Sequence, residues 1–235
     1  MTNFTDVLWQ YDEFQQVGTD YADAAEVAKY DSRHADFRNM EAEALELLDS
    51  IGVRNTDVLI DFGSGTGKFA ILAAERCRMV HAVDVSAAMI GYAGAKAVQK
   101  GVKNIEFHQA GFLTYEHKGT PVDIIVTTLA FHHLPDFWKG IALKRLNAML
   151  KTGGMLYMRD VIITEPNAIE NIAAFINMLA VKGGQSMKKE TERHFKEEFS
   201  TYDWVMDGLF ARSDFSIKSK AFDGGVLGTY ICIKN

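Results

Sequence analysis

The stretch Asp57-Val-Leu-Ile-Asp-Phe-Gly-Ser-Gly-Thr-Gly-Lys68 decides how the rest of this 235-residue chain is organised. Its first part, Val58 to Phe62, is a short apolar run interrupted only by Asp61, as in a strand buried within a parallel sheet. Glycines then alternate at positions 63, 65 and 67, and an apolar pattern with helical spacing follows. Glycine permits positive φ and close approach of a ligand to the backbone, and a helix start offers free N–H groups. The stretch therefore predicts a strand, a tight turn and a helix that together hold a nucleotide-like group.

Two common nucleotide-binding motifs do not fit this turn. The dinucleotide fingerprint is G-x-G-x-x-G, whereas the spacing here is G-x-G-x-G, and Phe69 stands where a P-loop needs Ser or Thr. The sequence Asp61-Phe-Gly-Ser-Gly-Thr-Gly67 instead resembles the first motif of the class I S-adenosylmethionine (SAM) dependent methyltransferases. This resemblance implies SAM as the cofactor, S-adenosylhomocysteine as its product and a Rossmann-like fold.

A second acidic position supports the resemblance. Met79-Val-His-Ala-Val-Asp84 has the pattern of the next strand, and it ends in a carboxylate that can accept both ribose hydroxyls. Val85 and Ser86 then begin a helix that continues past Met89. A glycine-rich turn alone is weak evidence, but the two motifs at this separation indicate a SAM-type site.

The remaining pattern predicts one α/β domain. We expect further strands at 104–108, 121–129 and 155–161, helices at 31–51, 86–100 and 202–212, and a hairpin of 215–222 with 226–233. With the resemblance, these elements predict a three-layer Rossmann-like sheet of seven mostly parallel strands, with an antiparallel strand from the C-terminal hairpin. We divide the domain into a helical N-terminal cap (1–44), a SAM-binding core (45–160), a helical lid insertion (161–200), and a C-terminal helix and hairpin (201–235). A solvated helix pair that only packs is the alternative to the lid.

The resemblance also implies which residues contact the cofactor. They are Tyr30, Asp61, Gly63, Ser64, Gly65, Gly67, Asp84, Val85, Met89, Gly111, Phe112, Thr128, Leu129 and His133. Tyr30 would approach the methionine end of SAM, or it lies on a solvated helix face. Family members commonly carry an acid for the adenine amino group where this chain has Gly111. That departure leaves adenine to the backbone near Gly111 and to the ring of Phe112.

Candidate catalytic residues follow the fourth and fifth strands. Methyl transfer from a sulfonium requires a positioned acceptor, exclusion of water and, for a protonated acceptor, a base. His132 and His133 are candidate bases because imidazole accepts a proton near neutral pH; alternatively, one orders the loop and the other lines the pocket. Asp160 is a third candidate, although it could simply pair with neighbours. His194 and Glu198 become candidates only if the lid closes over the site.

No metal or disulfide is predicted. Catechol-type methyltransferases need several oxygen ligands at the strand ends, where this chain offers only Asp160. The adjacent histidines are not arranged to face one ion from a strand end. Cys77 and Cys232 lie far apart in sequence, and we expect both to be buried and reduced.

Composition narrows the partners. The net charge of -6 argues against a nucleic-acid partner, and the chain has neither a signal-peptide pattern nor a membrane span, so we expect a cytoplasmic monomer or homodimer. We predict a methyltransferase that acts by in-line displacement on a small molecule of aromatic or partly hydrophobic character. If the lid helices fold back, its pocket would be formed by Phe112, Phe131, Trp138, Phe175 and Met178; most of these side chains could equally belong to the core. The rival interpretations are a catalytically silent SAM-binding or regulatory subunit of a larger assembly and, more distantly, a nicotinamide-dependent oxidoreductase.

Overall fold

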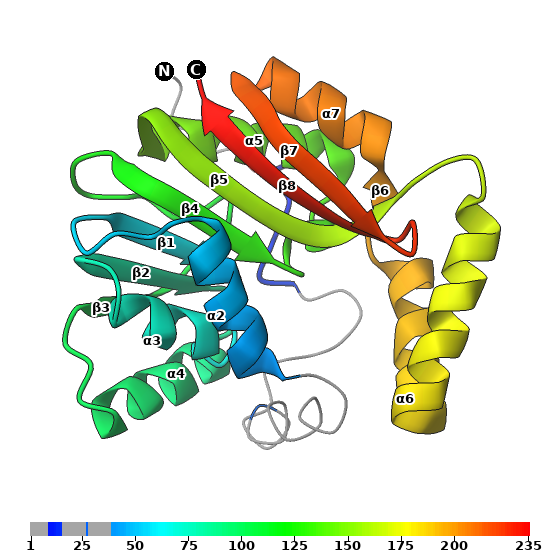
Figure 1. Ribbon diagram of the computed structural model, residues 1–235, viewed down its shortest axis with the longest axis horizontal. Coiled ribbons are helices and arrows are strands. Elements are labelled where there is room, and N and C mark those ends of the chain that lie inside the picture. Colours follow the sequence, from blue (N-terminus) through cyan, green and yellow to red (C-terminus); the bar gives the residue numbers. More distant parts are fainter. Residues whose placement is uncertain (1–8, 16–26, 28–38) are drawn as a thin grey trace.

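The computed structural model describes residues 9–15, Val27 and 39–235. Its centre is one twisted sheet in the order β3-β2-β1-β4-β5-β8-β7, with a short β6 paired to β5 outside this path (Figure 1). The strands are β1 (Val58–Phe62), β2 (Met79–Asp84), β3 (Ile105–Gln109), β4 (Val122–Thr128), β5 (Leu150–Ile163), β6 (Thr201–Tyr202), β7 (Phe215–Asp223) and β8 (Leu227–Lys234).

The direction of the strands confirms the predicted Rossmann-like sheet. β1 to β5 pair in parallel, and β8 is antiparallel to both β5 and β7. The two-residue β6 is an addition that the sequence pattern did not predict. From β1 the chain passes outward through β2 and β3, then crosses back to β4 on the other side of β1. Ligands of open α/β sheets bind at such a reversal, outside the carboxyl ends of the strands.

Helices cover both faces of the sheet and form the other two layers (Figure 1). On one face lie α2 (Met40–Ser50), α3 (Lys68–Ala74) and α4 (Ala87–Gln99); on the other lie α5 (Asp136–Met149) and α7 (Asp203–Arg212). Each face of the sheet has its own apolar core, and alternate residues of β1 pack into one or the other. Leu59 packs with α2 and α3, while Ile60 packs with α5 and α7. This alternation is why β1 reads as a continuous apolar run.

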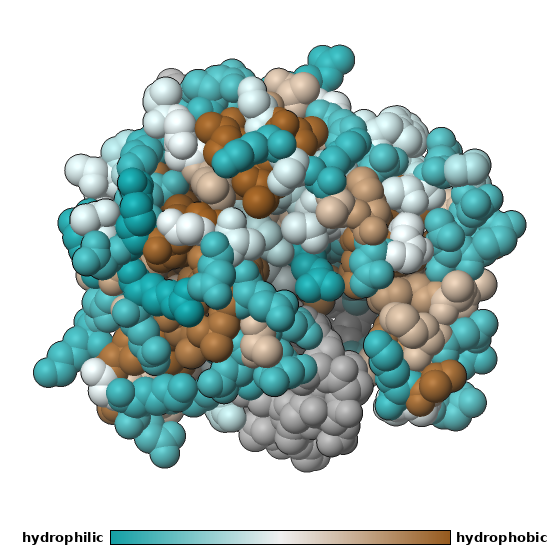
Figure 2. Space-filling model, viewed as in Figure 1, coloured by the Kyte–Doolittle hydropathy of each residue, from teal (hydrophilic) through white to brown (hydrophobic). Residues whose placement is uncertain are grey.

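The predicted insertion is α6 (Ala168–Glu197), which projects from the side of the sheet as two arms. Gly184 separates the arms, because its φ of 68° and ψ of -162° are not helical. Figure 2 shows the surface indented where α6 meets the rest of the molecule.

Both cysteines are free and buried, as predicted. Within the described residues, no helix combines the length and apolarity that crossing a bilayer requires.

Candidate cofactor and acceptor site

The glycine turn between β1 and α3 has the backbone that the sequence predicts. Gly63, Gly65 and Gly67 all have positive φ, at 71°, 51° and 73°. A Cβ at Gly63 would lie 2.3 Å from the Cβ of Ala130, and one at Gly67 would lie 2.7 Å from the Cβ of Ala93. A Cβ at Gly65 would have no neighbour within 4 Å. Two glycines therefore permit close packing of neighbouring segments, and Gly65 borders open space.

Asp84 lies beside this turn at the carboxyl end of β2. Its Oδ2 accepts a hydrogen bond from the Gly65 N–H at 2.8 Å, and its Oδ1 accepts one from the Ser86 N–H at 2.8 Å. Burial raises the pKa of the Asp84 carboxyl, and these two N–H groups counteract the rise. Each oxygen keeps a further lone pair for a ligand hydroxyl. The Ser86 hydroxyl accepts from the Met89 N–H at 3.1 Å, which fixes the start of α4 next to Asp84.

Asp61 provides a second carboxyl beside the turn. It is 4% exposed, and no hydrogen bond reaches its side chain from the described residues. Burial, and next the charge of Asp84, raise the pKa of Asp61 to about 8. A buried carboxyl without a partner is costly. A ligand that brings a cation or a donor to Asp61 would offset this cost.

Asp160 and His132 form a buried ion pair just beyond the end of β4, where the pairing of β4 with β5 stops. Asp160 accepts hydrogen bonds from the N–H groups of Phe131 and Val161, both at 2.7 Å, and its Oδ1 lies 2.5 Å from Nδ1 of His132. The other ring nitrogen of His132 lies 3.1 Å from Oε2 of Glu198. Burial alone would lower the pKa of His132, but the two carboxylates hold it above its ordinary value. This geometry favours the interpretation in which His132 and Asp160 order the loop.

His133 has the opposite protonation state. Burial, and next the charge of His132, lower its pKa to about 4, so the ring is neutral at pH 7. Its backbone carbonyl accepts a hydrogen bond from the Tyr11 hydroxyl at 3.3 Å. Just before this loop, Leu129 has a φ of 53°, which is rare for a residue other than glycine and marks strain at the ligand edge of the sheet. Of the two adjacent histidines, His133 is therefore the one with a free lone pair, although a pKa this low makes its ring a weak base.

The end of α6 is fastened to the same loop. The Phe199 N–H donates to the His132 carbonyl at 2.9 Å, and the buried Lys139 ammonium donates to the Phe199 carbonyl. The Phe199 ring also meets the ring of Tyr11 edge to face, with centroids 6.2 Å apart. The insertion and residues 9–15 thus both lie against the His132–His133 loop.

Glu13 is a site residue that the sequence analysis missed. Its carboxylate accepts hydrogen bonds from the Leu113 N–H at 3.0 Å and from the Thr114 hydroxyl at 2.7 Å. A Cβ placed on Gly111 would lie 2.3 Å from Glu13 Oε2, so this carboxylate occupies the space of a side chain at position 111. No sequence signal links residues so far apart in the chain.

Other expected site residues are distributed differently. Tyr30 lies outside the described residues. The residues expected to line an apolar pocket are divided in the structure: Phe112 and Phe131 are buried in the core, whereas Met178 on α6 is 41% exposed. The Phe112 ring stacks on Phe62 with centroids 5.1 Å apart, so its face is already covered by protein. The apolar residues of this set serve packing because both faces of the sheet need a core.

Comparisons with known proteins agree with this geometry. Residues 59–154 match a family model described as a methyltransferase domain. An uncharacterized methyltransferase from Geobacillus thermodenitrificans is 27% identical over 206 residues, which is 88% of each chain. Two solved structures share the fold. A SAM-dependent methyltransferase from Aquifex aeolicus has a TM-score of 0.59 and 19% identity, covering 91% of this chain and 99% of that one. Geranyl diphosphate methyltransferase in complex with SAM has a TM-score of 0.68 and 14% identity, covering 94% and 98%.

The glycine turn, the sheet order and these matches show that the chain has the Rossmann-like fold of SAM-dependent methyltransferases and is similar to a methyltransferase domain over residues 59–154. The residues present fit that cofactor. Open space lies beside Gly65, Asp84 retains acceptor capacity at the end of β2, and Asp61 lacks a partner within the described residues.

Proposed function

We propose that the protein transfers the methyl group of SAM to a small-molecule acceptor held beside His133. When bound, SAM supplies a methyl group already activated by a sulfonium, so the protein has to bind, orient and exclude water. The observation that carries the proposal is the pair of carboxylates beside the glycine turn, the buried Asp61 and the half-buried Asp84, which accepts from the Gly65 N–H. Asp84 would accept the ribose hydroxyls, and Asp61 would face the cationic amino group.

At the adenine end, Glu13 would replace the acid that position 111 lacks. Its carboxylate is already held by Leu113 and Thr114, and an ionised carboxylate has about four acceptor sites, which leaves capacity for an amino group. Because the ring of Phe112 is buried, this residue would contribute its backbone groups to adenine binding rather than a stacking surface. The N-terminal segment would then take part in holding the cofactor that it covers.

On the acceptor side, His133 would accept the proton of an acceptor that must lose one. The His132–Asp160–Glu198 ion pairs would keep the neighbouring loop rigid, and the end of α6 and residues 9–15 would restrict the acceptor to a small molecule. Geranyl diphosphate methyltransferase, of similar fold, has been solved in complex with geranyl diphosphate, a small molecule. The net charge of -6 also disfavours a nucleic-acid acceptor.

The test is calorimetry of the full chain with SAM, S-adenosylhomocysteine and NAD, followed by transfer of a labelled methyl group to a panel of small acceptors. We expect both adenosyl compounds to bind, NAD not to bind, and at least one acceptor to be labelled. Binding of NAD alone would refute the proposal. Tight SAM binding without labelling of any acceptor in a broad panel would instead favour a silent SAM-binding subunit.

A further inference from the structure

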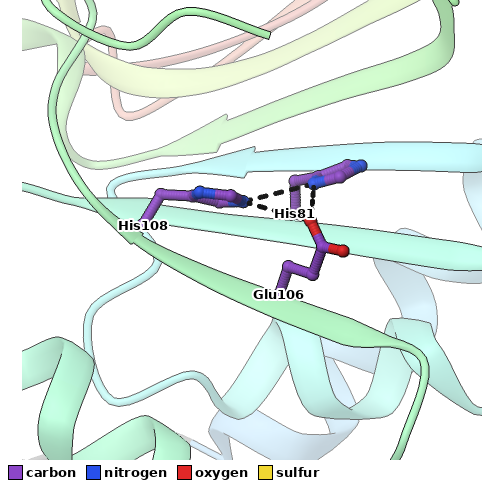
Figure 3. A group of neighbouring side chains, drawn as sticks. All are labelled: His81, Glu106 and His108. Carbon is purple, nitrogen blue, oxygen red and sulfur yellow. Dashed lines mark hydrogen bonds and ion pairs between the residues drawn. The ribbon is translucent and has the colours of Figure 1, made fainter. Parts of the chain in front are cut away.

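A group of three potential metal ligands lies apart from the cofactor site, on the edge strand β3 and its neighbour β2 (Figure 3). His81 is paired with Glu106 across the two strands, and His108 lies two residues beyond Glu106. Side chains two residues apart on a strand share one face of a sheet. Figure 3 shows the three side chains directed toward one another from adjacent strands.

The three ligand atoms are spaced as a bound cation requires. Nδ1 of His81 lies 3.2 Å from Nε2 of His108 and 3.2 Å from Oε2 of Glu106, and the last two atoms are 3.7 Å apart. A point about 2.0 Å from all three atoms follows from these distances, which is the length of zinc bonds to histidine nitrogen and carboxylate oxygen. The three atoms therefore lie close enough together to coordinate one ion.

Hydrogen bonds within the group do not engage all three facing atoms at once. A neutral imidazole carries one N–H and one lone pair. If His81 donates from Nδ1 to Glu106, the Nε2 of His108 must face either that same N–H or the carboxylate. If His108 donates from Nε2 to Nδ1 of His81, that His81 nitrogen carries no hydrogen and cannot donate to Glu106. A divalent cation satisfies all three lone pairs at once.

The surroundings leave a fourth coordination position open. The side chains of His81, His108 and Glu106 are 13%, 32% and 55% exposed. The ring of His117 lies 5.0 Å from that of His81, but its two nitrogens contact the Tyr115 hydroxyl and the Thr120 carbonyl. His117 is thus a neighbour of the group rather than a ligand, and solvent can reach the centre.

We propose that His81, Glu106 and His108 bind a divalent transition metal of the zinc class, with water as the fourth ligand. Two imidazoles, one carboxylate and a water form a donor set that zinc accepts. The ion would tie the edge strand β3 to β2 below Asp84. This site differs from the strand-end arrangement that the sequence analysis considered when it predicted no metal, and it does not depend on the proposed function.

A second group of three, His132, His194 and Glu198, is a poorer candidate and provides a control. Glu198 there lies between two histidines, and the remaining nitrogens of these rings contact Asp160 and Ser200. Its members already satisfy one another through ion pairs, so a cation would have to displace them.

The experiment is calorimetric titration of untagged, chelator-treated full-length protein with Zn²⁺. We expect one ion per chain, and at least a 100-fold loss of affinity in His81→Gln and in His108→Gln, since even outer-shell changes cost about 10–100-fold. His117→Gln and His194→Gln are the matched controls, and both should keep the ion.

Circular dichroism of the metal-free variants establishes that each is folded, and Glu106→Gln gives a third ligand variant of unchanged shape. Absence of zinc binding in the wild-type protein would overturn the proposal. Binding that survives the changes at 81 and 108 but is lost in His194→Gln would overturn it as well, because the ion would then lie at the other group.

Discussion

Replacing Asp61 by Asn should weaken SAM binding while making the free protein more stable. The carboxyl is buried without a partner in the described residues, and its pKa is raised to about 8 from an ordinary 3.8. In the unfolded chain the Asp61 carboxyl ionises above about pH 4, whereas in the folded protein it keeps its proton until about pH 8. The folded state therefore binds more protons than the unfolded state between these values, and stability falls as the pH rises through this window.

The magnitude follows from the same shift. Because Asp61 ionises at a higher pH in the folded protein than in the unfolded chain, the free energy of unfolding at pH 7 is lower than at acidic pH by at most about 4 kcal/mol. The Asp61→Asn variant lacks this loss. For a chain of this size, each 1 kcal/mol moves the Tm by about 2–4 °C. Differential scanning calorimetry without ligand should show a higher Tm for the variant at pH 7 and equal values near pH 4.

Ligand binding should respond with the opposite sign. Because the amino group of SAM needs the ionised carboxyl, the affinity of the wild-type protein should rise about ninefold between pH 6 and pH 7, as expected for a group with a pKa near 8. The Asn variant should bind more weakly, with no such slope. A variant that binds SAM as tightly as the wild-type protein, with the same pH dependence, would refute this role of Asp61.

Four further changes test the rest of the site. Asp84→Ala should weaken SAM binding by about 1–3 kcal/mol in calorimetry, because the ribose hydroxyls lose a charged acceptor; equal affinity would show that this carboxylate does not face the sugar. Glu13→Ala should weaken S-adenosylhomocysteine binding, and adding Gly111→Asp should restore it by returning a carboxylate to the same space; failure of this rescue would contradict the adenine assignment. Glu198→Gln should lower the pKa of His132 in an NMR titration, since burial is then opposed by Asp160 alone; an unchanged pKa would show that the pair does not set it. His133→Gln should reduce kcat by about 10²–10⁴-fold for an acceptor that must lose a proton; an unchanged kcat and pH profile would exclude His133 as the base.

Local patterns predicted most of the sheet. The strand, glycine turn and helix around Asp61 follow one another closely in the sequence. The apolar run, the alternating glycines and the helical apolar spacing each indicate one type of backbone conformation. Asp84 could be placed because the end of β2 must lie beside the end of β1 in a parallel pair. The C-terminal hairpin followed equally from local signals.

The contacts that finish the site could not be predicted in this way. Glu13 reaches Leu113 across a hundred residues, and Glu198 reaches His132 from a separate helix. Periodicity records which face of an element is apolar, but it does not record which distant polar side chain arrives there. Pocket and core residues could not be told apart for a related reason, since aromatic residues near a sheet edge are also the residues that a core requires.

The zinc-class group left a partial signal. Glu106 and His108 stand two residues apart in a predicted strand, which places both side chains on one face. Their meeting with His81 depends on the register between β3 and β2, and nothing local fixes that register. The pattern could therefore have suggested a pair of ligands, but not the third.

A crystal structure of the full chain with S-adenosylhomocysteine tests the central claim most directly. We expect both ribose hydroxyls within hydrogen-bond distance of Asp84, the amino group at Asp61, and backbone 63–67 against the ligand. A nucleoside bound at another place, or an Asp84 carboxylate directed away from the sugar, would contradict the account.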